Sequence, residues 1–212
     1  MLLALNAALD EQEKKSDVQK AEPKKIENAS TQYEVRTVEK HLDFPKYKTA
    51  DIERLARRYL PYNYKGMVKE ILLIEAPLSE ELLLRRTVSY FGREKVTSVV
   101  LEQYNSLMRG CQQIGIIRRN GFLYLSDAQS PRFRVPGDMT REIKHIAPEE
   151  LADGMLQILR QNLSAEKAGL YRALAAQCGF ARVGKAISDY FDEVLKLLNR
   201  CVTVDGETIS IK

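Results

Sequence analysis

The stretch Cys-Val-Thr-Val-Asp-Gly-Glu-Thr-Ile-Ser-Ile, residues 201–211, places two alternating β-prone runs around an Asp-Gly pair. The stretch Ile-Ile-Arg-Arg-Asn-Gly-Phe-Leu-Tyr-Leu, residues 116–125, does the same around Asn-Gly. Asn-Gly and Asp-Gly favour two-residue hairpin turns because both turn residues accept a positive φ. Both stretches therefore predict β-hairpins. In the later one, Val202 and Val204 can be opposed either by Thr208 and Ser210 or by residues 209 and 211, depending on register.

A stretch with helical periodicity precedes each predicted hairpin. Apolar side chains recur at helical spacing in both stretches, and we interpret them as core positions rather than as a cofactor site. They are Val96, Val99, Val100, Tyr104, Leu107, Met108 and Cys111, matched by Val183, Ala186, Ile187, Phe191, Val194, Leu195 and Leu198.

The same order of patterns occurs twice along the chain. Segment 71–125 is matched by segment 156–211, with an offset of 85 residues at the start, 87 in the middle and 85 at the end. Such a recurrence indicates the unit of folding. Three kinds of signal predict helix starts. Ser79 and Ser164 are predicted N-caps, and Pro148 suits a first turn. Acidic residues follow the two serines, namely Glu80, Glu81 and Glu166.

Three helices followed by a hairpin is the winged-helix arrangement, so the sequence predicts a mainly helical α+β fold with two winged-helix modules in tandem. We expect a flexible N-terminal segment over 1–48, in which 33–38 has strand-like alternation. A first module with a leading helix, capped by Thr49, follows over 49–130. A linker over 131–147 then leads to a second module over 148–212.

Composition limits the functional classes. The 212 residues are 44% apolar and 29% charged, which is typical of a soluble globular protein. No apolar run approaches the roughly 20 residues of a membrane span, and the N-terminus is unlike a secretory signal, so we expect a cytoplasmic protein with no membrane partner. The three cysteines lack paired spacing and there are only two histidines. We therefore predict no catalytic residues, no metal site and no cofactor.

One near-match to a phosphate-binding loop is rejected. Gly179-Phe-Ala-Arg-Val-Gly-Lys-Ala has the loop's spacing, but Ala186 replaces the Ser or Thr whose hydroxyl would hold magnesium. The preceding stretch, 171–178, also resembles a helix and not the strand that such a loop follows. We interpret Gly179 as a turn before a helix that starts near Val183.

Basic residues at corresponding positions of the two copies suggest contacts with phosphates. The net charge is +4, and residues 67–135 carry ten Lys and Arg against seven Asp and Glu, whereas residues 139–212 carry ten of each. We predict nucleic-acid contacts at the start of each third helix and beside the first hairpin turn; the residues are Arg93, Lys95, Arg182, Lys185, Arg118 and Arg119. Acidic residues on the later third helix would oppose this; they are Asp189, Asp192 and Glu193.

The chain resembles an uncharacterised domain at the carboxyl end of large bacterial helicase-like proteins that also carry a small endonuclease domain. The resemblance covers about residues 67–212 and lies in three stretches: Glu75-Ala-Pro-Leu-Ser-Glu-Glu-Leu with Arg85-Arg86, Ile146-Ala-Pro-Glu-Glu-Leu-Ala, and Cys178-Gly-Phe-Ala-Arg-Val-Gly-Lys-Ala-Ile. Where that family tends to have Gly before the proline and His after it, this chain has Ala76 and Ser79, so no histidine role is implied. The helicase and nuclease motifs are absent from this sequence. The resemblance implies an accessory DNA-associated module.

Two functions remain open from the sequence. In the first, a non-enzymatic winged-helix module binds DNA with little sequence preference, through phosphates, beside a helicase or nuclease. In the second, the chain is a protein-interaction module that docks onto a helicase, onto a nuclease or onto its own twin as a homodimer. The neutral charge of the second copy favours the latter.

Overall fold

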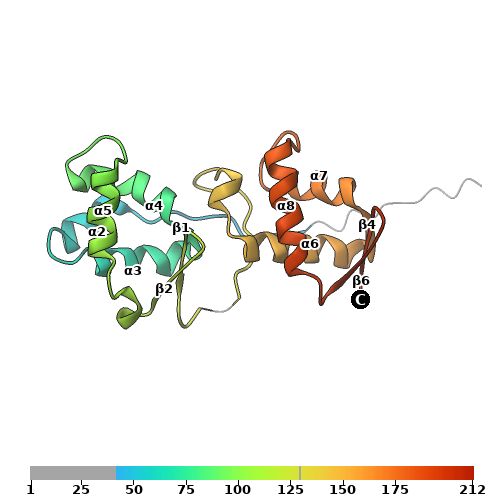
Figure 1. Cartoon of the computed structure of the whole chain (residues 1–212), viewed down its shortest axis with the longest axis horizontal. Helices are drawn as coiled ribbons and strands as arrows, with labels where there is room; N and C mark the ends of the chain where they lie inside the picture. Colours follow the sequence, from blue (N-terminus) through green and yellow to red (C-terminus); the bar gives the residue numbers. More distant parts are fainter. Residues whose placement is uncertain (1–41, 129) are drawn as a thin grey trace, which may run out of the picture. The chain divides into compact units, whose positions relative to one another are not determined.

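The computed structural model describes residues 42–128 and 130–212, so the expectations for residues 1–41, including the strand at 33–38, lie outside the described residues. The described residues adopt an α+β fold, with helices and two three-stranded antiparallel sheets (Figure 1). They all belong to one compact unit of the chain.

The first set of elements, here called the N-terminal module, covers residues 52–125. In chain order its elements are α2 (Ile52–Tyr59), α3 (Tyr64–Glu75), β1 (Leu78–Ser79), α4 (Glu80–Thr87), η1 (Val88–Phe91), α5 (Ser98–Leu107), η2 (Cys111–Ile114), β2 (Ile116–Arg119) and β3 (Phe122–Leu125). Its sheet has the order β1-β3-β2.

The C-terminal module covers residues 148–211 and follows the short 3-10 helix η3 (Ile143–His145). Its elements are α6 (Pro148–Asn162), β4 (Ser164–Glu166), α7 (Lys167–Gln177), α8 (Lys185–Leu197), β5 (Val202–Asp205) and β6 (Thr208–Ile211). The sheet order β4-β6-β5 repeats that of the first sheet, and so does the sequence of helix, short strand, two helices and hairpin. Among the described α-helices, only α2 stands outside this common order.

Helix starts follow local capping chemistry, with three corrections. Ser79 Oγ accepts a hydrogen bond from Leu82 N, and Pro148 opens α6, as expected. Asp51, not Thr49, caps α2, because its carboxylate accepts from Arg54 N at 2.9 Å. Ser164 is not a cap, since β4 draws residues 164–166 into the sheet and α7 begins only at Lys167. The third correction concerns α8, which begins at Lys185 and not near Val183.

Both predicted hairpins are present, but their turns differ. Asn120 and Gly121 both have positive φ, as a two-residue turn of that type requires. In the later hairpin the turn is Gly206-Glu207, and Asp205 ends β5 opposite Thr208. Only Gly206 has positive φ there, which is the pattern of a turn with glycine in its first position. The register pairs Val202 with Ile211 and Val204 with Ile209.

Each module has its own apolar core, and the third helices contribute a narrower stripe than predicted. On α5 and just beyond it, the buried residues are Val100, Tyr104, Met108 and Cys111, while Val96, Val99 and Leu107 are exposed. On α8 the fully buried residues are Phe191 and Val194, with Leu198 just after, and Ala186 is exposed. Each helix therefore presents more of its circumference to solvent than a full core-facing stripe would allow.

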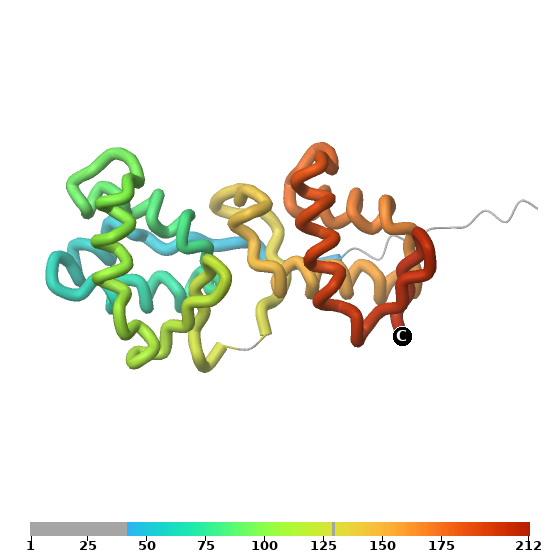
Figure 2. The backbone as a smooth tube through the Cα atoms, viewed as in Figure 1, coloured from blue at the N-terminus to red at the C-terminus, as the bar shows by residue number. Residues whose placement is uncertain are grey.

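The segments 42–48 and 131–147 are packed, which corrects the expected flexible segment and linker. Phe44 and Phe133 meet edge to face, with ring centres 4.8 Å apart, within the core of the C-terminal module. The two segments run side by side through backbone hydrogen bonds from Tyr47 N to Val135 O and from Val135 N to Pro45 O (Figure 2). Gly137 lies so close to the 42–48 segment that a Cβ atom at position 137 would be 2.3 Å from the carbonyl oxygen of Tyr47. Large aromatic side chains thus turn a linker into part of the core.

Candidate nucleic-acid interface

Arg93 and Lys95 lie in the loop between η1 and α5, where both side chains are exposed. Neither forms an ion pair or hydrogen bond with any residue that the structure describes. The α5 helix begins directly after them, with Thr97 Oγ1 accepting from Val100 N. These two cations are therefore exposed and available to an anionic partner.

Arg118 is held inside the N-terminal module. Its guanidinium donates to Glu80 Oε2 at 2.7 Å and to Asn105 Oδ1 at 2.8 Å, and it lies over the ring of Tyr104. The Tyr104 hydroxyl donates to the same Glu80 oxygen. Arg118 thus ties β2 to α5 and to the start of α4, and its charge is already balanced.

Arg119 and the hairpin that carries it are tied to the C-terminal module. Its Nη2 donates to Glu149 Oε1 at 2.6 Å, and its guanidinium lies 4.7 Å from the centre of the Tyr124 ring. The Tyr124 hydroxyl donates to the other oxygen of Glu149, on α6. The structure therefore does not bring Arg118 and Arg119 together with Arg93 and Lys95 as free cations.

Arg182 and Lys185 lie at the corresponding place before and at the start of α8. Arg182 is exposed and has no polar partner among the described residues. Lys185 is 90% exposed, and its Nζ lies 3.5 Å from Asp189 Oδ2. At the offset of 87 residues between α5 and α8, Arg182 matches Lys95, whereas Lys185 matches Ser98 and is partly balanced by Asp189.

A basic depression, here called the α7–α8 notch, adds one residue that the sequence reasoning missed. It has a volume of about 560 Å³ and is lined by Arg172, Arg182 and Lys185 together with Ala168, Ala176, Phe180 and small neighbours. No Asp or Glu is among its lining residues. Arg172 lies between Ala168 and Ala176 at four-residue spacing on α7, and no pattern in the sequence marks it as part of a site.

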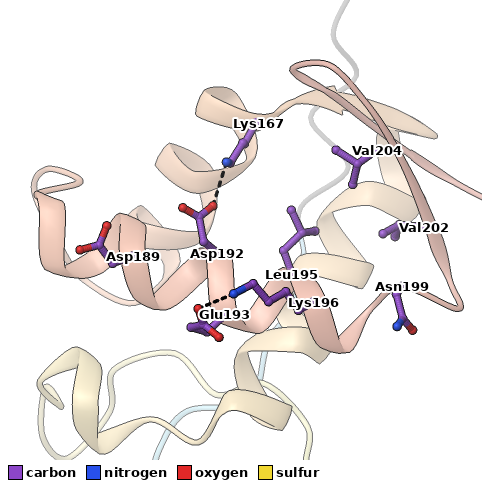
Figure 3. A pocket seen from close by; sticks show the side chains of 9 residues that line it. All are labelled: Lys167, Asp189, Asp192, Glu193, Leu195, Lys196, Asn199, Val202 and Val204. Carbon is purple, nitrogen blue, oxygen red and sulfur yellow. Dashed lines mark hydrogen bonds and ion pairs between the residues drawn. The ribbon is translucent and has the colours of Figure 1, made fainter.

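Acidic residues lie further along the same side of α8, after Lys185. Asp189, Asp192 and Glu193 line a second depression, of about 720 Å³, with Val202 and Val204 of β5 (Figure 3). Lys167 Nζ lies 2.8 Å from Asp192 Oδ1, and this hydrogen bond holds the pKa of Asp192 below its usual range. Asp192 is therefore ionised at neutral pH. The three acidic residues outnumber the two lysines of the same lining, Lys167 and Lys196, so this part of α8 disfavours phosphate at short range.

The exposed side of α5 mixes apolar residues with polar ones, among them Glu102, and lacks basic residues. Val99, Leu101 and Leu107 are between about two fifths and half exposed, and no Lys or Arg occurs between residues 96 and 108. Arg and Lys make the commonest specific contacts with bases in a major groove. The side chains on α5 are thus poorly suited to base reading.

Two carboxylates are fully buried, and the first of them joins the modules through an arginine. Glu150 of α6 is fully buried and accepts from Arg134 at 2.8 and 3.1 Å and from Arg141 at 2.6 and 2.9 Å. Arg134 also donates to the carbonyl oxygens of Glu75 and Pro77 at 3.0 and 3.1 Å. The segment before α6 is therefore bonded to the end of α3.

Glu75 is the second of these carboxylates and is also fully buried. It accepts from the Tyr47 hydroxyl at 2.5 Å, from Ala50 N at 2.8 Å and from Arg86 at 2.6 Å. Burial raises the pKa of Tyr47 well above its usual value, so its hydroxyl stays a neutral donor. Fully paired carboxylates of this kind fix structure and leave no free group for acid–base catalysis.

The described residues provide little for covalent or metal chemistry. Burial raises the pKa of the Cys178 thiol to about 12 and raises that of Cys111, so both thiols are protonated at neutral pH. No group of three or more His, Cys, Asp or Glu side chains within 42–128 and 130–212 could hold a metal ion. No helix in this part of the chain is long and apolar enough to cross a membrane.

His145 is a buried imidazole beside an ionic cluster. Its Nε2 has no hydrogen-bond partner among the described residues and lies 3.7 Å from Glu81 Oε2. Burial lowers the pKa of His145 below its ordinary 6.5, against the opposing effects of Glu142 and Glu81. The unfolded chain then binds more protons than the folded one as the pH falls through about 6.5.

We expect the free energy of unfolding to decrease between pH 7.5 and 5.5, and to decrease less in His145→Asn. The pKa values of Glu81 and Glu142 are lowered from 4.5, chiefly by hydrogen bonds from Lys144 and Arg85 respectively, so their stabilisation is lost only at more acidic pH. Urea denaturation at the two pH values measures the difference. An equal decrease in both proteins would contradict the role given to His145.

Comparison with protein-family models, with curated proteins and with solved structures finds no match for this chain.

Proposed function

We propose that this chain is a non-enzymatic tandem winged-helix module that associates with nucleic acid through phosphate contacts. The observation that carries the proposal is the presence of free, exposed cations at the same place in both modules: Arg93 and Lys95 before α5, and Arg182 before α8. The repeated order of helices, strands and hairpin, with the first strand of each sheet paired to the last, supports this interpretation.

The mechanism is anchoring of the backbone with little reading of bases. The lack of basic residues on the exposed side of α5 and the acidic residues of α8 both disfavour insertion of a third helix into a major groove. The N-terminal hairpin contributes little as a free wing, because Arg118 and Arg119 are already paired. Binding of this kind depends steeply on salt, with a slope of roughly 0.7 to 0.9 for each phosphate contact.

The resemblance described above suggests the setting. We propose that the module works in the cytoplasm as an accessory to a DNA-acting protein such as a helicase or nuclease.

Reversing two charges tests the contact. Arg93→Glu with Lys95→Glu is expected to weaken binding to labelled DNA at low salt by about tenfold or more, because two phosphate contacts become repulsions. Fluorescence anisotropy at two salt concentrations measures both affinity and salt slope.

The matched control is Lys48→Glu with Lys69→Glu, which makes the same change in net charge at two exposed, unpaired lysines of the same region. Equal loss in both double variants would show a general charge effect, not a site. No binding by the unaltered protein at low salt would refute the proposed function.

A second candidate function is protein interaction, favoured by the acidic and apolar depression between α8 and β5 (Figure 3). Its carboxylates and exposed Val204 suit a basic segment of a partner protein or of a second copy of this chain. Asp189→Lys with Glu193→Lys would abolish such docking. Light scattering tests self-association, and a lighter particle for the variant would favour a homodimer.

A further inference from the structure

The α7–α8 notch is concave, as is the depression that Lys95 lines, but Glu81 and Glu94 line that depression and no Asp or Glu lines the notch. Its volume of about 560 Å³ lies within the roughly 300–1,000 Å³ of sites that enclose small ligands or single chemical groups. Three cations surround it, and Arg172 and Arg182 have no polar partner among the described residues. Exposed, unbalanced arginines around a hollow favour an anionic group that enters the hollow.

The wall of the notch is apolar. Ala168 and Ala176 flank Arg172 on α7, and Phe180 lies in the loop that leads to α8. The two alanines are exposed, so their small side chains leave room beside Arg172. A group that combines a negative charge with a flat apolar part would match both halves of this lining.

The acidic residues further along α8 restrict the direction of approach. A double helix lying along α8 would bring its phosphates close to Asp189 and Glu193, which line the acidic depression. A duplex also stacks its bases inside and presents phosphates on a broad outer surface, which cannot enter a depression of this size. A single strand can turn one nucleotide outward and present its base and phosphate together.

We propose that the α7–α8 notch receives one unpaired nucleotide of single-stranded nucleic acid. Arg172, Arg182 and Lys185 surround its phosphate, and Phe180 with the alanines of α7 contacts its base. This inference rests on the proposed function and adds to it the form of nucleic acid that is bound and a further contact residue, Arg172. Asp189 competes with the phosphate for Lys185 from 3.5 Å away, so the two arginines carry most of the contact.

Two variants of the full chain test the notch independently. Arg172→Glu reverses a cation that has no partner to lose, and it is expected to weaken binding of a labelled oligothymidylate by about tenfold. Ala176→Leu fills the notch without changing charge and is expected to weaken the same binding at least about fivefold, through loss of the base contact. Arg160→Glu is the control, because Arg160 is an exposed, unpaired cation on α6 outside the notch.

Anisotropy titrations compare single-stranded DNA, single-stranded RNA and a duplex of the same length. We expect single strands to bind more tightly than the duplex, Ala176→Leu to spare duplex binding, and Arg160→Glu to have a smaller effect than Arg172→Glu. Similar affinities for the two single strands would indicate recognition of base and phosphate alone, and a difference would indicate that the sugar is contacted as well. Circular dichroism confirms that each variant is folded.

The failures are distinguishable. If binding is abolished by Arg93→Glu with Lys95→Glu but unchanged by Arg172→Glu and Ala176→Leu, the proposed function stands and the notch is not a nucleotide site. A preference for duplex over single strands also overturns the inference. If the unaltered protein binds no nucleic acid at low salt, both proposals are wrong.

Discussion

Replacing Glu150 with alanine is expected to lower the free energy of unfolding by about 3–5 kcal/mol. The substitution leaves the guanidinium groups of Arg134 and Arg141 buried without their carboxylate, and each now donates two hydrogen bonds to it. An uncompensated buried charge costs far more than the intact pair contributes. Urea denaturation followed by circular dichroism measures the change.

The adjacent residue provides the control. Glu149 is also paired, with Arg119 and Tyr124, but its side chain is about one third exposed. Water screens that pair, so Glu149→Ala is expected to cost no more than about 1 kcal/mol. Similar losses from the two substitutions would mean that the Glu150 carboxylate is not buried as described.

Replacing Phe133 with alanine is expected to cost about 3–5 kcal/mol, the range for removing a buried aromatic ring. The ring is fully buried against Phe44, and it lies so close to α6 that a Cβ on Gly154 would be 2.8 Å from its Cγ. The same denaturation experiment reports the loss, and exposed Arg132 is the control, with an expected change within about 0.5 kcal/mol for Arg132→Ala. A loss below about 1 kcal/mol at Phe133 would show that this segment is only a linker.

Patterns with a local physical cause were predicted well. The two hairpins were predicted because Asn120-Gly121 and Asp205-Gly206 combine turn residues with β-prone neighbours, and both hairpins are present. The cap at Ser79 and the first turn at Pro148 depend on one or two residues, and both are confirmed. The shift of the later turn to Gly206-Glu207 shows that glycine alone satisfies the need for positive φ there.

Features that depend on distant partners were missed. Segment 131–147 has the mixed composition of a linker, and nothing nearby in the sequence shows that Phe133 will meet Phe44 or that Arg134 will meet Glu150. Ser164 has the composition of a cap, but pairing of β4 with β6 decides its role. Contacts of this kind become visible only when the chain is folded.

The candidate interface was predicted in part. Exposure of Arg93, Lys95 and Arg182 follows from their place in loops beside helix starts. The engagement of Arg118 and Arg119 could not be predicted, because their partners on other elements are 38 and 30 residues away along the chain. The role of Arg172 could not be predicted, because the notch is formed only when α7 packs beside the loop that precedes α8.

The bond network around Arg134 has a practical consequence for anyone who wishes to cut this protein in two. Cleavage of the chain after Ser130 would leave the carbonyl acceptors of Glu75 and Pro77 in one fragment and their donor, Arg134, in the other. The same cleavage would separate Phe44 from Phe133. Each fragment would expose surface that the other fragment covers in the intact chain. The two modules should therefore be expressed, crystallised or fused to other proteins only as one piece.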